Sequence, residues 1–145
     1  MKDQVIMLFP ARSENEVLAR SFSAAYAARF DPTLRELEDI RTAVSEAVTN
    51  VVVHAYPGGR GQVRMEFSGQ GSILSIRVSD DGIGIEDIDR AREALYTSKP
   101  SMERSGLGFT VMEAFMDRVE VTSVPGQGTT VLLIKHIGQG KDVSP

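Results

Sequence analysis

Glu46, Asn50 and His54 follow one another at intervals of four residues in a stretch with helical hydrophobic periodicity. Since successive i+4 steps on an α-helix drift by only about 40°, these side chains share one face. An asparagine oxygen suits Mg²⁺, and a glutamate that reaches a hydroxyl group can accept its proton. The pattern therefore indicates phosphoryl-transfer chemistry, although a solvated helix face carries the same residue types. His54 is interpreted as a structural hydrogen-bonding residue.

A second polar cluster is Asp80-Asp81-Gly82-Ile83-Gly84-Ile85, which follows the strand-like run Ser72–Ser79. Glycine lets a flat ligand approach the backbone closely and adopts positive φ without steric cost. We interpret the segment as the floor of a purine pocket in which Asp80 accepts a hydrogen bond from an exocyclic amine. ATP should then bind better than GTP, because guanine would place a carbonyl oxygen against the carboxylate. The alternative is a surface turn, since Asp-Gly is a common hairpin signal.

A third segment, Gly106-Leu107-Gly108, opens a predicted helix after a polar loop, Tyr96–Ser105. Backbone N–H groups at a helix N-terminus bind phosphate well. Arg104, Ser105 and Lys99 lie beside this segment and are expected to reach a triphosphate; the alternative is a flexible loop with solvated charges. The loop is predicted to be a lid that the γ-phosphate orders.

The elements that must position these residues follow from periodicity. Alternation of apolar and polar residues predicts strands at Gln4–Phe9, Val63–Phe67, Ser72–Ser79, Val119–Val124 and Thr129–Ile137. Helices are predicted from Ser13 to Phe30, with a capping box of Ser13 and Glu16, and at Thr33–Ala55, Glu86–Leu95 and Gly106–Asp117. The order β-α-α-β-β-α-α-β-β predicts an α+β fold, a mixed, mostly antiparallel sheet with helices on one face.

Length and composition narrow the function. The 145 residues predict one domain over 1–137 and a disordered tail over 138–145. A net charge of −4 argues against a general nucleic-acid binder. The lack of cysteine excludes thiol catalysis, and two histidines make a His-rich zinc site implausible. No segment approaches a membrane span or a signal peptide, so we expect a cytoplasmic protein without a membrane partner.

Together these segments resemble the GHKL ATPases, whose fold is the two-layer α/β sandwich also called the Bergerat fold. Glu46-x-x-x-Asn50 is similar to the N box of that superfamily, and Asp80-x-Gly82-x-Gly84 and Gly106-x-Gly108 are similar to its two glycine boxes. Within it, the chain resembles the sporulation anti-sigma F factors of endospore formers over about Met7 to Ile137. The stretches that carry this resemblance are Ala11–Glu16, Ser45–Asn50, Thr97–Pro100 and Glu103–Phe109. Ser98 departs from the more usual threonine but keeps the hydroxyl.

The resemblance implies an ATP-dependent protein serine kinase that is also an anti-sigma factor. As a homodimer it would hold a sigma factor of the sigma F type in an ATP-bound complex, and it would phosphorylate a serine of an anti-anti-sigma factor. Glu46 would be the catalytic base and Asn50 the Mg²⁺ ligand. Partner contacts would come from Glu16 and Arg20. The residues implied to bind ATP are Asn50, Asp80, Gly82, Gly84, Thr97, Lys99, Arg104, Ser105, Gly106, Leu107, Gly108 and Thr130, with Asp80, Gly84 and Thr130 at the base.

Other functions fit some of the same motifs. One is a nucleotide-dependent anti-sigma switch that phosphorylates nothing, and another is a stress-response anti-sigma kinase. A sensor-kinase fragment ranks lower, because it would need a phospho-acceptor histidine helix and the only histidines are His54 and His136. For the dimer, the first strand and first helix are candidate surfaces, with core packing as the alternative.

Overall fold

The computed structural model describes residues 4–85 and 104–138 of the chain. Within these ranges five strands form one sheet in the order β1-β2-β3-β5-β4, and every neighbouring pair is antiparallel. The strands are β1 (Gln4–Pro10), β2 (Gln62–Gln70), β3 (Ile73–Asp80), β4 (Arg118–Val124) and β5 (Gly128–His136). The five strands predicted from alternation are thus confirmed, and the sheet contains no parallel pair in the part of the chain described.

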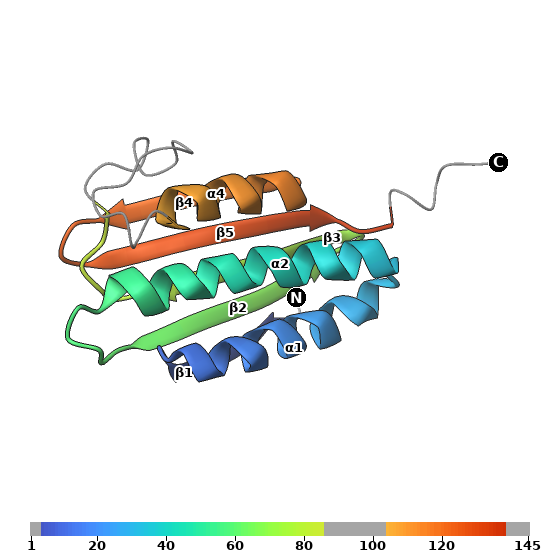
Figure 1. Ribbon diagram of the computed structural model, residues 1–145. Coiled ribbons are helices and arrows are strands. Elements are labelled where there is room, and N and C mark those ends of the chain that lie inside the picture. The colour runs from blue at the N-terminus through green and yellow to red at the C-terminus, as the bar shows by residue number, and fades with distance from the viewer. Residues whose placement is uncertain (1–3, 86–103, 139–145) are drawn as a thin grey trace.

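One face of the sheet is buried because its strands alternate. In β2, Val63, Met65 and Phe67 are fully buried, whereas Arg64 between them is exposed. Burying one such apolar side chain contributes about 1.5–3 kcal/mol. The helices cover this face, with α2 lying between α1 and α4 (Figure 1). The predicted α+β fold with helices on one face is confirmed.

The described helices are α1 (Glu16–Ala27), α2 (Leu34–Asn50) and α4 (Arg104–Phe115). Three short helical turns accompany them: η1 (Ser13–Asn15), η2 (Ala28–Phe30) and η3 (Val51–Ala55). None of the described helices is both long and apolar enough to cross a membrane. The predicted helix Glu86–Leu95, the lid residues 96–103 and the tail residues 139–145 lie outside the described residues.

The predicted capping box of Ser13 and Glu16 is wrong. α1 begins at Glu16, and its N-cap, Asn15, makes no side-chain cap hydrogen bond. The Glu16 carboxylate instead accepts hydrogen bonds from hydroxyl groups of α2. A complete capping box occurs at the start of α2, where the hydroxyl of Thr33 accepts from the N–H of Glu36 and the carboxylate of Glu36 accepts from the N–H of Thr33.

Two predicted helix boundaries also need correction. The helix predicted to run to Ala55 stops being α-helical at Asn50, and η3 continues it as a π-helical turn. α4 begins at Arg104 rather than Gly106, so Arg104 and Ser105 belong to the helix and not to the loop. The second glycine segment therefore lies inside the first two turns of α4.

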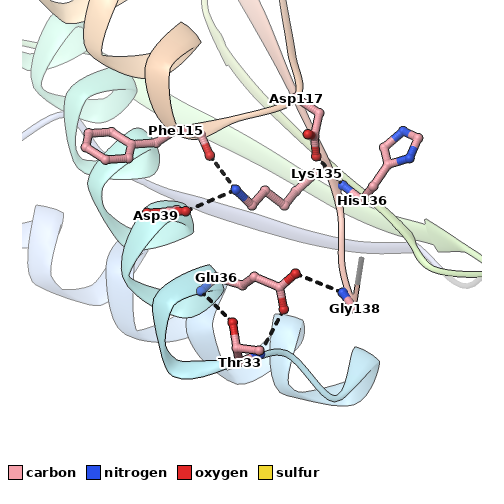
Figure 2. A network of polar contacts seen from close by, with 8 residues as sticks. All are labelled: Thr33, Glu36, Asp39, Phe115, Asp117, Lys135, His136 and Gly138. Carbon is pink, nitrogen blue, oxygen red and sulfur yellow. Dashed lines mark hydrogen bonds and ion pairs between the residues drawn. The ribbon is translucent and has the colours of Figure 1, made fainter. Parts of the chain in front are cut away.

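A polar network ties α2, α4 and β5 together near the start of α2 (Figure 2). Nζ of Lys135 donates to the carbonyl oxygen of Phe115 at 2.6 Å and to Oδ2 of Asp39 at 3.2 Å. Glu36 uses its other carboxylate oxygen, Oε2, to accept from the N–H of Gly138 at 2.9 Å. The N–H of His136 donates to Oδ2 of Asp117 at 2.6 Å. These bonds fix the ends of α4 and β5 against the first turns of α2.

Candidate functional site

α2 and α4 meet where Glu46 and Asn50 face Gly108. A Cβ placed on Gly108 would lie 3.1 Å from Nδ2 and 3.3 Å from Oδ1 of Asn50, and 3.4 Å from Oε2 of Glu46. Because glycine has no Cβ, both polar side chains lie directly against the backbone of α4. The structure thus brings together the predicted acid–amide pair and the second glycine segment.

Asn50 is bonded less completely than a buried amide usually is. Its Nδ2 is buried and has no hydrogen-bond partner among the residues that the structure describes. An unsatisfied buried donor costs roughly 1–3 kcal/mol, so native proteins contain few of them. The chain then continues directly into the π-helical turn η3, a conformation that is rare and often found at functional sites. Both features favour a ligand at this end of α2.

Asp80 ends β3, and Oδ1 of its carboxylate accepts from the N–H of Gly82 at 2.9 Å. Burial raises the pKa of Asp80 above its ordinary value. The backbone N–H groups of Gly82 and of Thr129, its register partner on β5, oppose this rise in the pKa, and the charge of Asp81 adds to it. Asp80 is half-buried, so it is both desolvated and accessible enough to accept a bond from a ligand amine.

The glycines after Asp80 are required by close backbone contacts. A Cβ on Gly82 would lie 2.1 Å from the carbonyl oxygen of Ala55, which also accepts from the N–H of Ile83 at 2.9 Å. Gly84 has a φ of +77°, and a Cβ there would lie 2.5 Å from the carbonyl oxygen of Val124. The loop is therefore held between η3 on one side and the β4–β5 hairpin on the other. Through η3 it is joined to the end of α2 that carries Glu46 and Asn50.

Thr130 is not brought to the same face as Asp80. It pairs with Ser79, and the two hydroxyl oxygens are 3.2 Å apart. Since side chains alternate along a strand, this pair lies on the sheet face away from the helices, whereas Asp80 and Thr129 lie on the helix face. On this geometry Thr129, rather than the predicted Thr130, is the threonine beside Asp80.

The two predicted partner-binding residues both lie on α1, one helical turn apart. Arg20 is half-buried, and its Nε is buried without a hydrogen-bond partner in the described part of the chain. Glu16 accepts from the hydroxyl groups of Ser45 at 2.5 Å and Thr49 at 2.7 Å. Its carboxylate is thus already bonded within the fold.

The remaining predicted ATP-binding residues are only partly described. Thr97 and Lys99 lie outside the described residues. The backbones of Arg104, Ser105, Gly106 and Leu107 form the first turn of α4. The N–H groups of a first helical turn have no partners within the helix, which is the geometry that suits a phosphate.

Sequence reasoning missed three residues that shape the loop. The hydroxyl of Tyr56 donates to the carbonyl of Gln62 at 2.7 Å and accepts from the N–H of Asp81 at 2.9 Å. The hydroxyl of Ser123 accepts from the N–H of Ile85 at 2.7 Å and donates to the carbonyl of Gly128 at 3.0 Å. Gly128 has a φ of +121°, and a Cβ there would lie 2.0 Å from the carbonyl oxygen of Asp80. Of the three, only Gly128 belongs to a sequence pattern that could have predicted its role, the Pro-Gly-Gln-Gly turn.

Comparison with known proteins defines the class. The family model of the histidine kinase-like ATPase domain matches residues 9–135. A solved structure of the RsbU and RsbW domains of a Mycobacterium tuberculosis protein superposes with a TM-score of 0.67, at 18% identity, over 93% of this chain and 32% of that one. At that identity the likeness concerns the fold alone. Fold, site and family model together define a histidine kinase-like ATPase domain.

Closer relatives narrow the class to one family. The chain is 49% identical to the anti-sigma F factor of Geobacillus thermodenitrificans over 97% of each chain. It is 47% identical to that of Oceanobacillus iheyensis over 99% of each chain. The chain therefore belongs to the anti-sigma F factor family. This confirms the resemblance drawn from the motifs.

Proposed function

We propose that this protein is an ATP-dependent serine kinase that also inhibits a sigma factor. Its substrate would be a serine of an anti-anti-sigma factor, and its inhibited partner a sigma factor of the sigma F type. The observation that supports the kinase assignment is the closeness of Glu46 and Asn50 to Gly108, because a proton acceptor and an amide oxygen then lie near the N-terminal turns of α4, where a phosphate would bind.

The chemistry follows from these positions. The serine hydroxyl oxygen forms a bond to the γ-phosphorus while the bond from that phosphorus to the bridging oxygen of ADP breaks. The hydroxyl proton passes to Glu46, and ADP leaves with the bridging oxygen. Such reactions depend mostly on positioning and on charge stabilisation around the transferred group. Asp80 orients the base from the far end of the nucleotide.

The donor set at Asn50 fits a magnesium ion. Mg²⁺ prefers oxygen ligands and is often held by one or two protein groups together with substrate phosphates. Asn50 would provide such a group through its amide oxygen Oδ1, which lies beside Gly108 at 3.3 Å from a Cβ placed there. When bound, the ion would neutralise charge on the β- and γ-phosphates, and Asn50 would help to hold the ion in place.

Partner binding is assigned to α1. Val17, which is 54% exposed, lies one turn before Arg20 on this helix. An exposed apolar side chain beside an arginine is a combination found in protein interfaces. We expect the sigma factor to co-elute with this protein when MgATP is present.

Dimerisation is assigned to β1, an edge strand on which Ile6 and Leu8 are 47% and 58% exposed. We also expect sedimentation to give the mass of a dimer.

The kinase assignment is tested with labelled ATP, Mg²⁺ and the anti-anti-sigma factor of the same organism. We expect label on a serine, and none when that serine is replaced by alanine. Glu46→Gln should keep ATP affinity and lower the transfer rate by roughly 10²- to 10⁴-fold. Transfer at the wild-type rate would show that Glu46 is not the base. ATP-dependent sigma binding without any transfer by the wild type would favour the non-catalytic switch.

A further inference from the structure

The carboxylate of Glu16 joins two helices beside the proposed catalytic pair. Oε1 accepts from the hydroxyl of Ser45 at 2.5 Å, and Oε2 accepts from the hydroxyl of Thr49 at 2.7 Å. All three side chains are half-buried. Hydrogen bonds to a charged acceptor are shorter and stronger than neutral ones, so this bridge holds α1 and α2 at a defined spacing.

Each of these hydroxyl residues immediately precedes a residue of the proposed site. Ser45 precedes Glu46, and Thr49 precedes Asn50. Since consecutive residues of an α-helix are about 100° apart, Ser45 and Thr49 face α1 on one flank of α2 while Glu46 and Asn50 face α4 on the other. A rotation of α2 that moved the hydroxyl pair away from Glu16 would equally move the catalytic pair relative to Gly108.

The tolerance for such a rotation is small. The space between Asn50 and Gly108 would not admit a Cβ without close contact, at 3.1 Å from Nδ2. The chain also leaves α-helical geometry directly after Asn50, where the π-helical turn η3 begins. The bonds from Glu16 lie in the two α-helical turns just before this change.

We propose that Glu16 is a positioning residue for the nucleotide site: its bonds to Ser45 and Thr49 set the rotation of α2 that presents Glu46 and Asn50 to MgATP. This inference rests on the proposed function, because it assigns Asn50 to the ion that accompanies ATP. It differs from a partner-contact role for Glu16, because it predicts an effect on nucleotide binding when no partner protein is present. Groups that orient a metal ligand typically change metal affinity or activity by about 10- to 100-fold when they are removed.

The test measures binding of a fluorescent ATP analogue to the purified protein alone while Mg²⁺ is titrated. Glu16→Gln keeps the shape of the side chain but replaces one acceptor oxygen with a donor. We expect the Mg²⁺ concentration for half-maximal binding to rise roughly tenfold. Glu14→Gln is the matched control, because Glu14 is an exposed carboxylate two residues earlier, and it should leave the midpoint unchanged.

A double variant on α2 removes the same hydrogen bonds from the other side. Ser45→Ala with Thr49→Val removes both hydroxyls and leaves Glu16 in place, and it should raise the Mg²⁺ midpoint by a similar factor. Combining it with Glu16→Gln should add little, because residues of one hydrogen-bond network are not additive. Thermal unfolding of each variant is measured in parallel, since a purely structural role would lower the melting temperature and leave the Mg²⁺ midpoint in place.

The outcomes separate the two proposals. If the wild type shows no Mg²⁺-dependent ATP binding, the proposed function fails and the inference on Glu16 fails with it. If the wild type and Glu14→Gln bind normally and both the Glu16 and the hydroxyl variants match them, the proposed function stands and the positioning role is overturned. A raised midpoint in both sets of variants, without additivity, supports it.

Discussion

The two ends of α2 differ in how completely their polar groups are bonded. At the start, Thr33 and Glu36 satisfy each other in a capping box, and Lys135 donates to Asp39 (Figure 2). At the other end, Asn50 has a buried Nδ2 with no partner among the described residues, and the helix passes into a π-helical turn. The network that α2 forms with α4 and β5 is thus complete at one end, whereas at the other end Asn50 lies beside α4 with an unsatisfied Nδ2.

This difference indicates that one end of α2 serves stability and the other end serves ligand binding. Bonded caps and bridged charges add stability, whereas unsatisfied groups and irregular turns cost stability and persist where a ligand completes them. Changes at the Asn50 end should therefore alter nucleotide binding more than stability. Changes at the Thr33 end should do the reverse. The predictions below test this contrast.

Gly108→Ala should have a large effect on nucleotide binding. The new Cβ would lie 3.1 Å from Nδ2 of Asn50, so the Asn50 amide must move by a few tenths of an ångström. Misplacement of about 1 Å can cost roughly 10²-fold, so we expect MgATP affinity or transfer to fall by about tenfold or more. Stability should not fall, because alanine is favoured over glycine in a helix by up to about 1 kcal/mol. Calorimetric titration and thermal unfolding measure the two effects.

Gly58→Ala is the matched control for this substitution. Gly58 lies in the turn after η3, and a Cβ there would meet no atom of the described residues within 4 Å. Nucleotide affinity should stay at the wild-type value. If Gly108→Ala also bound MgATP normally, the close contact with Asn50 would have no role in binding, and the contrast between the two ends would be lost.

Asp80 gives a prediction on pH. Because burial raises its pKa, the folded state binds this proton more tightly than the unfolded chain does. Its contribution to stability is therefore full below the unfolded pKa and is lost as pH rises through the raised folded pKa. The ionised form that accepts from the adenine amine is lost as pH falls through the same folded pKa. ATP affinity should thus weaken on acidification at a higher pH than for an ordinary aspartate.

Asp80→Asn separates these two effects. It removes the desolvated charge and should maintain or raise stability at neutral pH. It should weaken ATP binding by about 10- to 100-fold and narrow the preference for ATP over GTP. Titrations of both nucleotides across pH measure this, with Asp81→Asn as the control for a neighbouring charge. Equal affinity of the wild type for ATP and GTP would reject the assignment of Asp80 to the amine.

Local sequence patterns were sufficient to predict the parts of the site that depend on one element. The spacing of Glu46 and Asn50 and the glycines after Asp80 needed only helical periodicity and the conformational freedom of glycine. Contacts between distant segments gave no such signal. Glu16 is 29 residues from Ser45, and its carboxylate binds there instead of forming the local capping box that the Ser13-x-x-Glu16 pattern predicted. The Glu16 carboxylate binds the part-buried hydroxyl groups of Ser45 and Thr49 rather than an exposed backbone N–H at the start of the helix.

The same limit explains the errors at helix ends and in the hairpin. A π-helical turn has no distinct hydrophobic period over five residues, so η3 could not be separated from α2. Thr129 and Thr130 are identical in type, and only the register with β3 decides which one lies beside Asp80. Pairing between β3 and β5 joins residues from 49 positions apart, for Asp80 and Thr129, to 63 positions apart, for Ile73 and His136. A local sequence pattern cannot predict the register between strands so far apart in the chain.

Lys135→Met should show the reverse behaviour at the other end of α2. The side chains of Lys135 and Asp39 are only 12% and 20% exposed, so the variant leaves a mostly buried carboxylate without its cation and removes the bond to the carbonyl of Phe115. We expect a loss of about 1–3 kcal/mol in the free energy of unfolding, with ATP affinity unchanged. Denaturant unfolding and calorimetric titration measure both. Arg41→Met is the control, because its ion pair with Glu38 is exposed at 46% and 68% and should contribute at most about 0.5 kcal/mol.

Thr33→Ala should have the smallest effect and tests whether the cap serves stability alone. It removes the hydroxyl that accepts from the N–H of Glu36 but leaves Glu36 able to bind the N–H of Gly138. We expect a loss of about 1 kcal/mol in stability, which Thr33→Ser should largely restore because serine keeps the hydroxyl. ATP affinity should equal that of the wild type, because the cap lies at the opposite end of the helix from Asn50. A variant of unchanged stability but weakened ATP binding would mean that the first turn of α2 transmits its position to the nucleotide site, and the two ends would no longer be independent.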